Sequence, residues 1–186
     1  VFATVQQRGS TTLYRFPVGG GAPAAVIDER GTVGAWSLAS DGTVAYAFTS
    51  PGSPSELFLK PAGVPSSRKL TELNADLLGG RSVAAVEAFT FRSFDGREIE
   101  AFLTKPATLA ATAGRAAHPM IVMIHGGPHG QQGPAFNHKA QVYGAQGWAT
   151  VMVNYRGSTG YGQKLADAIF KDQNGGEAKD VLAGVD

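Results

Sequence analysis

The sequence has no cysteine in its 186 residues, which excludes disulfide bonds and thiolate metal sites. It also lacks any apolar run approaching the roughly 20 residues that a membrane-spanning helix needs, so no membrane partner is expected. Basic residues form no block and the formal net charge is +1, which argues against a nucleic-acid-binding surface. We expect no metal and no organic cofactor. The lack of cysteine is compatible with the cytoplasmic location that we expect.

The composition is that of a folded protein, with 43% hydrophobic and 17% charged residues. The chain begins with Val1 and no signal-peptide pattern precedes it. Its last ten residues have a helical pattern without a glycine or proline stop signal. We interpret the sequence as an excised piece of a longer protein. Its expected partner is the remainder of the same polypeptide, possibly as a separate chain, and a homo-oligomer stays open.

Residues 1–82 predict short β-strands separated by turns. Asp41-Gly42 is a favourable tight-turn pair, because glycine adopts positive φ at little cost. A faint repeat relates the stretch that starts at Val5 to the stretch that starts at Phe48, an offset of about 43 residues that suits a propeller blade. We interpret this region as the C-terminal part of a β-propeller, with an antiparallel sandwich as the alternative.

Residues 83–106 have the pattern of a β-hairpin that turns at Asp95-Gly96. Phe89 and Phe91 alternate with polar residues, as one face of a half-buried strand pair requires. Residues 107–118 are small and polar without a strong period, and we expect a loop there.

From residue 119 the pattern becomes that of an α/β fold. The apolar runs "PMIVMI" (119–124) and "WATVMV" (148–153) predict strands of a parallel sheet, the first of them buried on both faces. Asn137 is expected to cap a helix through about Gln146. A second helix is predicted from an apolar stripe formed by Tyr161, Leu165 and Ile169.

The chemistry lies where the predicted strands end, because ligands of open α/β sheets bind beyond the carboxyl ends of strands. His125-Gly126-Gly127-Pro128 follows the first apolar run. Glycines at such a position let a substrate approach the backbone, so that free N–H groups can point at developing negative charge. We expect an oxyanion hole with Gly127 as the main donor and Gly126 as the second. The alternative is a tight strand exit without catalytic meaning.

Three stretches carry a resemblance to a known family. "IHGGPHG" and "NYRGSTGYGQKLADAIFKDQNGGEAKDVLAGVD" are similar to the prolyl oligopeptidase family of serine peptidases, and nearest to its acylaminoacyl-peptidase and dipeptidyl-peptidase branches. "VEAFTFRSFDGREIEAFLTKP" resembles the segment in which that family's propeller leads into its hydrolase domain. The resemblance covers about residues 83–186, and residues 1–82 match only in character.

The resemblance implies a β-propeller followed by an α/β-hydrolase domain with a Ser-Asp-His triad, of which residues 83–186 are the N-terminal half. The nucleophile of this fold sits in a Gly-x-Ser-x-Gly elbow on a later strand, and the chain contains no such motif. Ser158 has the wrong spacing and follows the wrong strand. We therefore expect the nucleophile, the acid and the base beyond residue 186, and we expect this segment alone to be inactive.

The resemblance also implies roles for the neighbouring residues. Some family members have tyrosine in place of His125, and the change to histidine shifts the oxyanion contacts to backbone amides. His125 is then a loop-orienting residue, Pro128 stiffens the loop, and His129 lines the substrate cleft or is a solvated loop residue. Arg156 either anchors its loop against one of the acids Glu177 and Asp180 or contacts substrate. We attribute those two acids to charge compensation at the start of the last helix.

The leading functional hypothesis is part of a serine peptidase that cleaves short peptides, or N-acylated or free N-terminal residues, by acyl transfer. One alternative is a carboxylesterase of the same fold, because ester and amide cleavage share the same machinery. Another is a hydrolase-like domain without catalysis that serves as a binding module.

Overall fold

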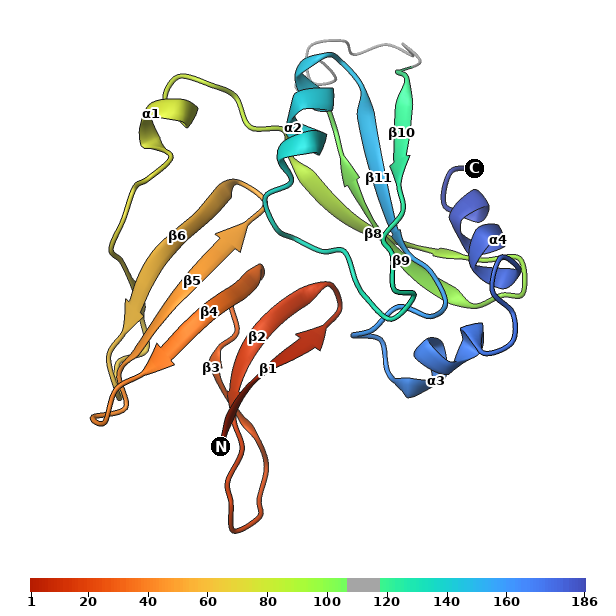
Figure 1. Ribbon diagram of the computed structural model, residues 1–186. Coiled ribbons are helices and arrows are strands. Elements are labelled where there is room, and N and C mark those ends of the chain that lie inside the picture. The colour runs from red at the N-terminus through yellow and green to blue at the C-terminus, as the bar shows by residue number, and fades with distance from the viewer. Residues whose placement is uncertain (107–117) are drawn as a thin grey trace. The chain divides into compact units, whose positions relative to one another are not determined.

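The computed structural model describes residues 1–106 and 118–186, so the loop expected at 107–118 lies almost entirely outside the described residues (Figure 1). Contacts between residues divide the chain into two compact units. Unit 1 comprises residues 1–6, 10–82 and 134–136, and unit 2 comprises residues 7–9, 83–133 and 137–186. Within the described ranges, no helix is both long and apolar enough to cross a membrane.

Unit 1 is a β-structure whose strands join in one sheet of order β1-β2-β4-β5-β6-β7, with β3 paired to β2. A sandwich would need two packed sheets. The elements are β1 (Phe2–Gln7), β2 (Ser10–Arg15), β3 (Ala24–Ile27), β4 (Thr32–Leu38), β5 (Val44–Ser50), β6 (Ser53–Lys60), β7 (Arg68–Lys69) and α1 (Ala75–Leu78). Both copies of the faint repeat are hairpins, β1-β2 and β5-β6. The expected turn at Asp41-Gly42 joins β4 to β5, with Gly42 at φ +87°.

One carboxylate holds the end of unit 1 together. Glu56, on β6, is only 3% exposed. It accepts hydrogen bonds from the Thr71 hydroxyl at 2.5 Å, from Leu73 N at 3.0 Å and from both the backbone and the side-chain nitrogen of Asn74 at 3.2 Å. These bonds, with that from Thr71 the strongest, lower the pKa of Glu56 to about 2. Glu56 thereby ties β6 to the segment that precedes α1.

Unit 2 is an α/β structure around a four-stranded sheet of order β10-β11-β9-β8. Strands β8 and β9 form the expected hairpin, β9 runs antiparallel to β11, and β10 runs parallel to β11. The elements are β8 (Val86–Arg92), β9 (Glu98–Thr104), β10 (Met120–Met123), α2 (His138–Ala145), β11 (Ala149–Asn154), α3 (Gln163–Ala166), η2 (Asp167–Ile169) and α4 (Gly176–Ala183). The predicted α/β class and its mixture of strands and helices are confirmed.

Helices cover both faces of this sheet. Successive side chains of β11 point to opposite faces, so they show what lies on each. Val151 and Val153 join a core with Ile99 on the face that α4 covers through Val181. On the other face, the side-chain amide of Asn137 contacts the sulfur of Met152 at 3.5 Å. Figure 1 shows α2 and α4 on either side of the sheet. β11 is therefore buried along its whole length.

The prediction that residues 121–124 are buried on both faces is wrong. β10 lies at the edge of the sheet and its only partner among the described strands is β11. Its side chains are half-buried, Met120 is 37% exposed, and Ile124, just beyond the strand, is 65% exposed. An apolar run indicates a strand that suits burial, but it does not show which of its sides has a neighbour.

The cap of α2 is confirmed, because the Asn137 side chain accepts a hydrogen bond from Ala140 N at 3.1 Å. The second predicted helix begins later than expected and is divided into α3 and the 3-10 turn η2. Gly160 and Gly162 have φ near +86° and +87°, which no helical residue adopts, so Tyr161 stands before α3 and not on its stripe. The helical turns end before Lys171, whose φ is +60°.

Candidate active site

The loop after β10 is built around glycines in special conformations. Gly127 has φ +134°, and a Cβ added to it would lie 2.7 Å from the backbone nitrogen of His129. The bond from Gly127 to Pro128 is cis. Gly126 is different, because a Cβ there would meet nothing within 4 Å. The backbone shape at Gly127 is thus open only to glycine.

His125 fixes the start of this loop. Its ring stacks on the Tyr155 ring with centroids 4.3 Å apart and an angle of 11°. Its Nε2 lies 2.9 Å from the Ser158 hydroxyl, and its Nδ1 lies 3.0 Å from the Gly126 carbonyl oxygen. The Tyr155 hydroxyl donates to the His125 carbonyl oxygen. Burial raises the pKa of Tyr155, with a smaller effect from the charge of Glu177, so this hydroxyl keeps its proton at neutral pH.

The rest of the loop is joined to the segment after β11. His129 Nδ1 lies 3.0 Å from the Gly157 carbonyl oxygen. Thr159 N donates to the Gly130 carbonyl oxygen at 2.8 Å. Parallel strands bring these two exits to the same edge of the sheet. The two loops are therefore held together from His125 to Gly130.

Two amides of this immobilised loop have no protein acceptor. Within the described part of the chain, neither Gly126 N nor Gly127 N donates a hydrogen bond, and both residues are exposed. Amides that are fixed in place and not used by the protein are suited to bind an anion or a developing oxyanion. The stretch 125–128 thus presents donors at the position where the sequence predicts them.

The contact between His125 and Ser158 is not a nucleophile and its base. Ser158 has no exposed surface, so its hydroxyl is not accessible to a substrate carbonyl. A catalytic pair also needs a third group that orients the base, and Nδ1 of His125 faces a carbonyl oxygen and a tyrosine hydroxyl instead of a carboxylate. The pair positions the loop.

Arg156 lies against a buried acid. Its Nε and backbone N both donate to Asp180 Oδ2, and its Nη2 donates to Asp180 Oδ1, each at 2.8 Å. Asp180 is fully buried and also accepts from the Ser93 hydroxyl. Hydrogen bonding to Asp180 raises the pKa of Arg156. Asp95 contacts the guanidinium at 3.1 Å from the rim. Only 5% of the surface of Arg156 is exposed, so its role is structural.

This geometry corrects the reading of Asp180 as a residue that compensates charge at a helix start. Its carboxylate accepts hydrogen bonds from Arg156 and Ser93, both of which lie outside α4. Glu177 does serve the start of α4, because it accepts from Gly175 N at 3.0 Å and from Asn174 N.

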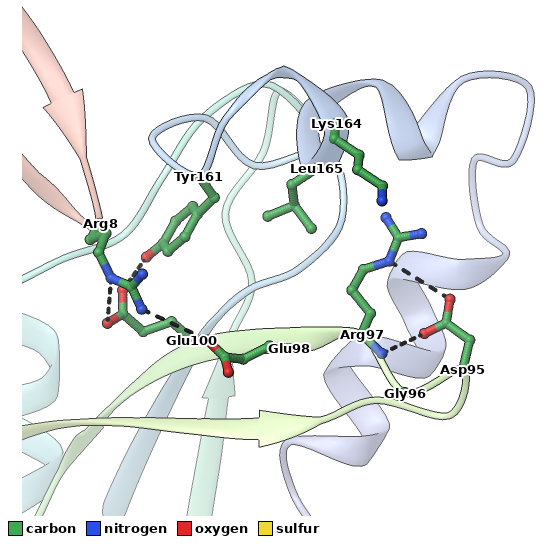
Figure 2. A pocket seen from close by; sticks show the side chains of 9 residues that line it. All are labelled: Arg8, Asp95, Gly96, Arg97, Glu98, Glu100, Tyr161, Lys164 and Leu165. Atoms are coloured by element: carbon green, nitrogen blue, oxygen red, sulfur yellow. Dashed lines mark hydrogen bonds and ion pairs between the residues drawn. The ribbon is translucent and has the colours of Figure 1, made fainter.

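A second polar network includes Tyr161, Glu100 and Arg8, which Figure 2 shows together. The Tyr161 hydroxyl donates to Glu100 Oε2 at 2.6 Å and accepts from Asn154 Nδ2 at 2.6 Å. Asn154 is fully buried and also exchanges hydrogen bonds with the backbone of Gln132 at 2.8 Å. Burial and then the bond to Glu100 raise the pKa of Tyr161. Arg8, which belongs to the same unit, lies 3.8 Å from Glu100.

Arg8, Glu100 and Tyr161 are among the residues that line a cavity of about 480 Å³. Figure 2 shows Arg8, Glu100 and Tyr161 on one side of it, and Arg97 with Asp95 on the other. On each side an arginine pairs with a carboxylate: Arg8 lies 3.8 Å from Glu100, and Arg97 lies 3.7 Å from Asp95. Paired charges of this kind are a poor source of a general acid or base, so this cavity is not the candidate reaction site.

A larger cavity of about 870 Å³ opens next to the loop, and Pro128 and His129 form part of its wall. No group of three metal-ligating side chains is found in the described ranges. Sequence reasoning identified the glycines, Pro128, the two histidines and Arg156. It missed Tyr155 and Ser158, although both stand in "NYRGS", directly after a strand whose exit faces the loop.

Comparisons with known proteins agree with this architecture. Residues 134–186 match the family model described as Prolyl oligopeptidase family. The uncharacterized peptidase YuxL of Bacillus subtilis is 33% identical over 180 residues, which is 96% of this chain and 27% of that protein. Dipeptidyl-peptidase 5 of Schizosaccharomyces pombe is 31% identical over 109 residues, or 58% of this chain and 16% of that protein.

Solved structures give the same result. The acylaminoacyl peptidase of Pyrococcus horikoshii has a TM-score of 0.85 and 25% identity, covering 99% of this chain and 28% of that chain. A puromycin-hydrolyzing peptidase of Mycobacterium tuberculosis shares the fold, with a TM-score of 0.75 and 22% identity. The chain spans little more than a quarter of the length of the relatives that cover it most fully. By sequence and by structure, the chain belongs to the prolyl oligopeptidase family.

Proposed function

We propose that the protein to which this chain belongs is a serine peptidase, and that residues 125–128 supply its oxyanion hole. The observation that carries the proposal is a pair of amides, Gly126 N and Gly127 N, which are held in place by the loop contacts and donate to no protein acceptor within the described residues. Family membership supplies the reaction class, and the two amides supply its chemical requirement.

In the proposed reaction a serine hydroxyl beyond residue 186 attacks the substrate carbonyl, while a histidine takes the hydroxyl proton. The C–O bond forms, and the carbonyl oxygen becomes an oxyanion that accepts hydrogen bonds from Gly127 N and Gly126 N. The C–N bond then breaks, and the histidine returns the proton to the leaving amine. Water hydrolyses the acyl-enzyme. An aspartate beyond residue 186 orients the histidine.

The side chain of His125 is not a donor in this scheme, because both ring nitrogens already face protein groups. Its role is to orient the loop through Tyr155 and Ser158. Pro128 and His129 line the cleft, and Arg156 anchors the segment after β11 to Asp180.

For the whole protein we propose that residues 1–82 are the C-terminal part of a β-propeller and residues 83–186 the N-terminal half of the hydrolase domain. Such a propeller would limit access to short, flexible substrates. The names of the relatives support short peptides with free or N-acylated ends, since they describe a dipeptidyl-peptidase and acylaminoacyl peptidases, one of them in complex with Z-Gly-Gly-Phe-chloromethyl ketone.

The test uses the intact protein with peptide anilides, N-acylated peptide anilides and short-chain esters. We expect hydrolysis of the anilides, together with covalent inactivation by a peptide chloromethyl ketone. Cleavage of esters alone would identify a carboxylesterase. A protein that cleaves none of these substrates and resists the chloromethyl ketone would be a binding module, and the proposal would be wrong.

A further inference from the structure

The cavity beside the proposed oxyanion loop has the size of a ligand site, since such sites usually span about 300–1,000 Å³ and this one measures about 870 Å³. Its lining comes from the loop and from the segment that follows α3, and consists of Pro128, His129, Ala166, Asp167, Ile169, Phe170, Lys171 and Gln173. Pro128 directly follows Gly127. A group in this cavity is therefore close to a carbonyl bound at Gly127 N.

One wall of the cavity is apolar. Phe170 is 77% exposed, while Ile169 and Ala166, which line the same cavity, are only 4% and 9% exposed. An exposed aromatic ring beside buried apolar residues, inside a concave site, is the kind of surface on which an apolar side chain binds. This wall favours a large aliphatic or aromatic group.

The rim of the cavity carries a cation. Lys171 Nζ lies 5.4 Å from the centroid of the Phe170 ring. No ion pair with Lys171 is found among the residues that the structure describes. The nearest acid in sequence that lines the cavity, Asp167, accepts a hydrogen bond from Gln163 Nε2 at 2.7 Å instead. The left-handed backbone of Lys171, at φ +60°, is unusual for a residue with a side chain.

We propose that this cavity, the Phe170 cavity, binds the leaving-group part of a short peptide, with an apolar side chain against Phe170 and the free C-terminal carboxylate at Lys171. The cation decides which part of the substrate binds. A linear peptide has one α-carboxylate, and it always lies on the leaving-group side of the bond that is cleaved. The inference rests on the proposed peptidase function and adds a preference for bonds close to the C-terminus.

The test compares peptides that share one acyl part and differ in the leaving group: Ala-Phe as the free acid, Ala-Phe as the C-terminal amide, and Ala-Ala as the free acid. In the intact protein, kcat/KM is expected to be about two- to fivefold higher for the acid than for the amide, the range of an exposed ion pair. It is expected to be about tenfold higher for Phe than for Ala, as for a well-packed aromatic pair.

Two variants separate the contributions. Lys171→Gln is expected to remove the difference between acid and amide but to keep the difference between Phe and Ala. Phe170→Ala is expected to do the reverse. Lys179→Gln is the matched control, because Lys179 Nζ also lies over an exposed ring, that of Phe94 at 4.9 Å, outside the cavity. It should keep both differences.

The outcomes distinguish this inference from the function on which it rests. If the wild-type protein cleaves the anilides and all three peptides at similar kcat/KM, the subsite is refuted and the peptidase stands. Equal losses on acid and amide in Lys171→Gln would also refute it. If the wild-type protein cleaves none of these substrates, the peptidase function itself fails.

Discussion

At the scale of single residues, two features of Gly127 disfavour any other residue: its backbone conformation and the lack of space for a Cβ. Its φ of +134° is unfavourable for other residues, and an added Cβ would lie 2.7 Å from His129 N. We expect Gly127→Val to lower kcat of the intact protein about 10²–10³-fold, the usual cost of one lost oxyanion donor. The measurement is the turnover of a peptide anilide.

Two other glycine variants make this result interpretable. Gly126→Ala keeps the amide and meets no atom within 4 Å, so a smaller loss is expected. Gly52→Ala, in a turn of unit 1 with open space around it, should leave turnover unchanged. An unchanged kcat in Gly127→Val would remove Gly127 from the oxyanion role.

Tyr155 tests whether the loop is held by its side-chain contacts. Tyr155→Phe removes the donor to the His125 carbonyl oxygen and keeps the ring stack at 4.3 Å. We expect kcat to fall about tenfold, because a displaced donor loses transition-state contact, while KM changes little. Tyr143→Phe is the control, since Tyr143 stacks on Trp148 away from the loop. A rise in KM at constant kcat would instead assign Tyr155 to substrate binding.

Glu56 predicts an acid-sensitive step in unit 1. Its pKa in the folded protein is lowered to about 2 from the ordinary 4.5, so its contribution to stability is fully present above pH 4.5 and is lost as the pH falls toward about 2. We expect the melting temperature to fall across this interval, and Glu56→Gln to flatten that part of the curve. Identical pH profiles for the two proteins would contradict the role of Glu56.

At the scale of elements, the pair of Arg156 and Asp180 joins the exit of β11 to α4. Asp180→Ala leaves a buried guanidinium whose remaining acid partner among the described residues is Asp95, and breaking such a pair costs about 3–5 kcal/mol. We expect this loss in the free energy of unfolding measured with urea. Glu87→Gln breaks the exposed pair with Lys105 and should cost less than about 1 kcal/mol. Equal losses would show that burial does not matter here.

Elements with a strong local pattern could be predicted from the sequence. The alternation of Phe89 and Phe91, the turn glycine at Gly96 and the cap at Asn137 each depend on neighbouring residues, and each is present in the structure. The edge position of β10 and the short α3 could not be predicted, because they depend on which strand lies alongside and on glycine conformations. Local pattern carries no information about either.

The candidate site divides in the same way. Glycines after an apolar run are visible in the sequence, so the loop was found. Its supports were not, because Tyr155 and Ser158 act on His125 across 30 and 33 residues of chain. The acid that pairs with Arg156 lies 24 residues away. The sequence offers both Glu177 and Asp180, and it does not show which of the two is buried.

At the scale of the whole molecule, β10 is an edge strand with exposed apolar residues, and within residues 1–106 and 118–186 it pairs with a strand on one side alone. Such edges pair with other chains. We expect residues 1–186, expressed alone, to self-associate and to hydrolyse no anilide, with light scattering and the anilide assay as measurements. Ile124→Lys, at the 65% exposed residue after β10, should reduce the association. An isolated chain that is monodisperse and melts cooperatively would refute this expectation.

The contacts that shape the loop span short stretches of chain, with 28 residues between His129 and Gly157 and 33 between His125 and Ser158. All four residues lie within this chain, and the entropic cost of closing a segment rises only slowly with its length, so these contacts need no residue encoded further along. In the proposed enzyme, the receptor for the charged oxygen would then assemble during synthesis, before the ribosome has made the group that creates the charge.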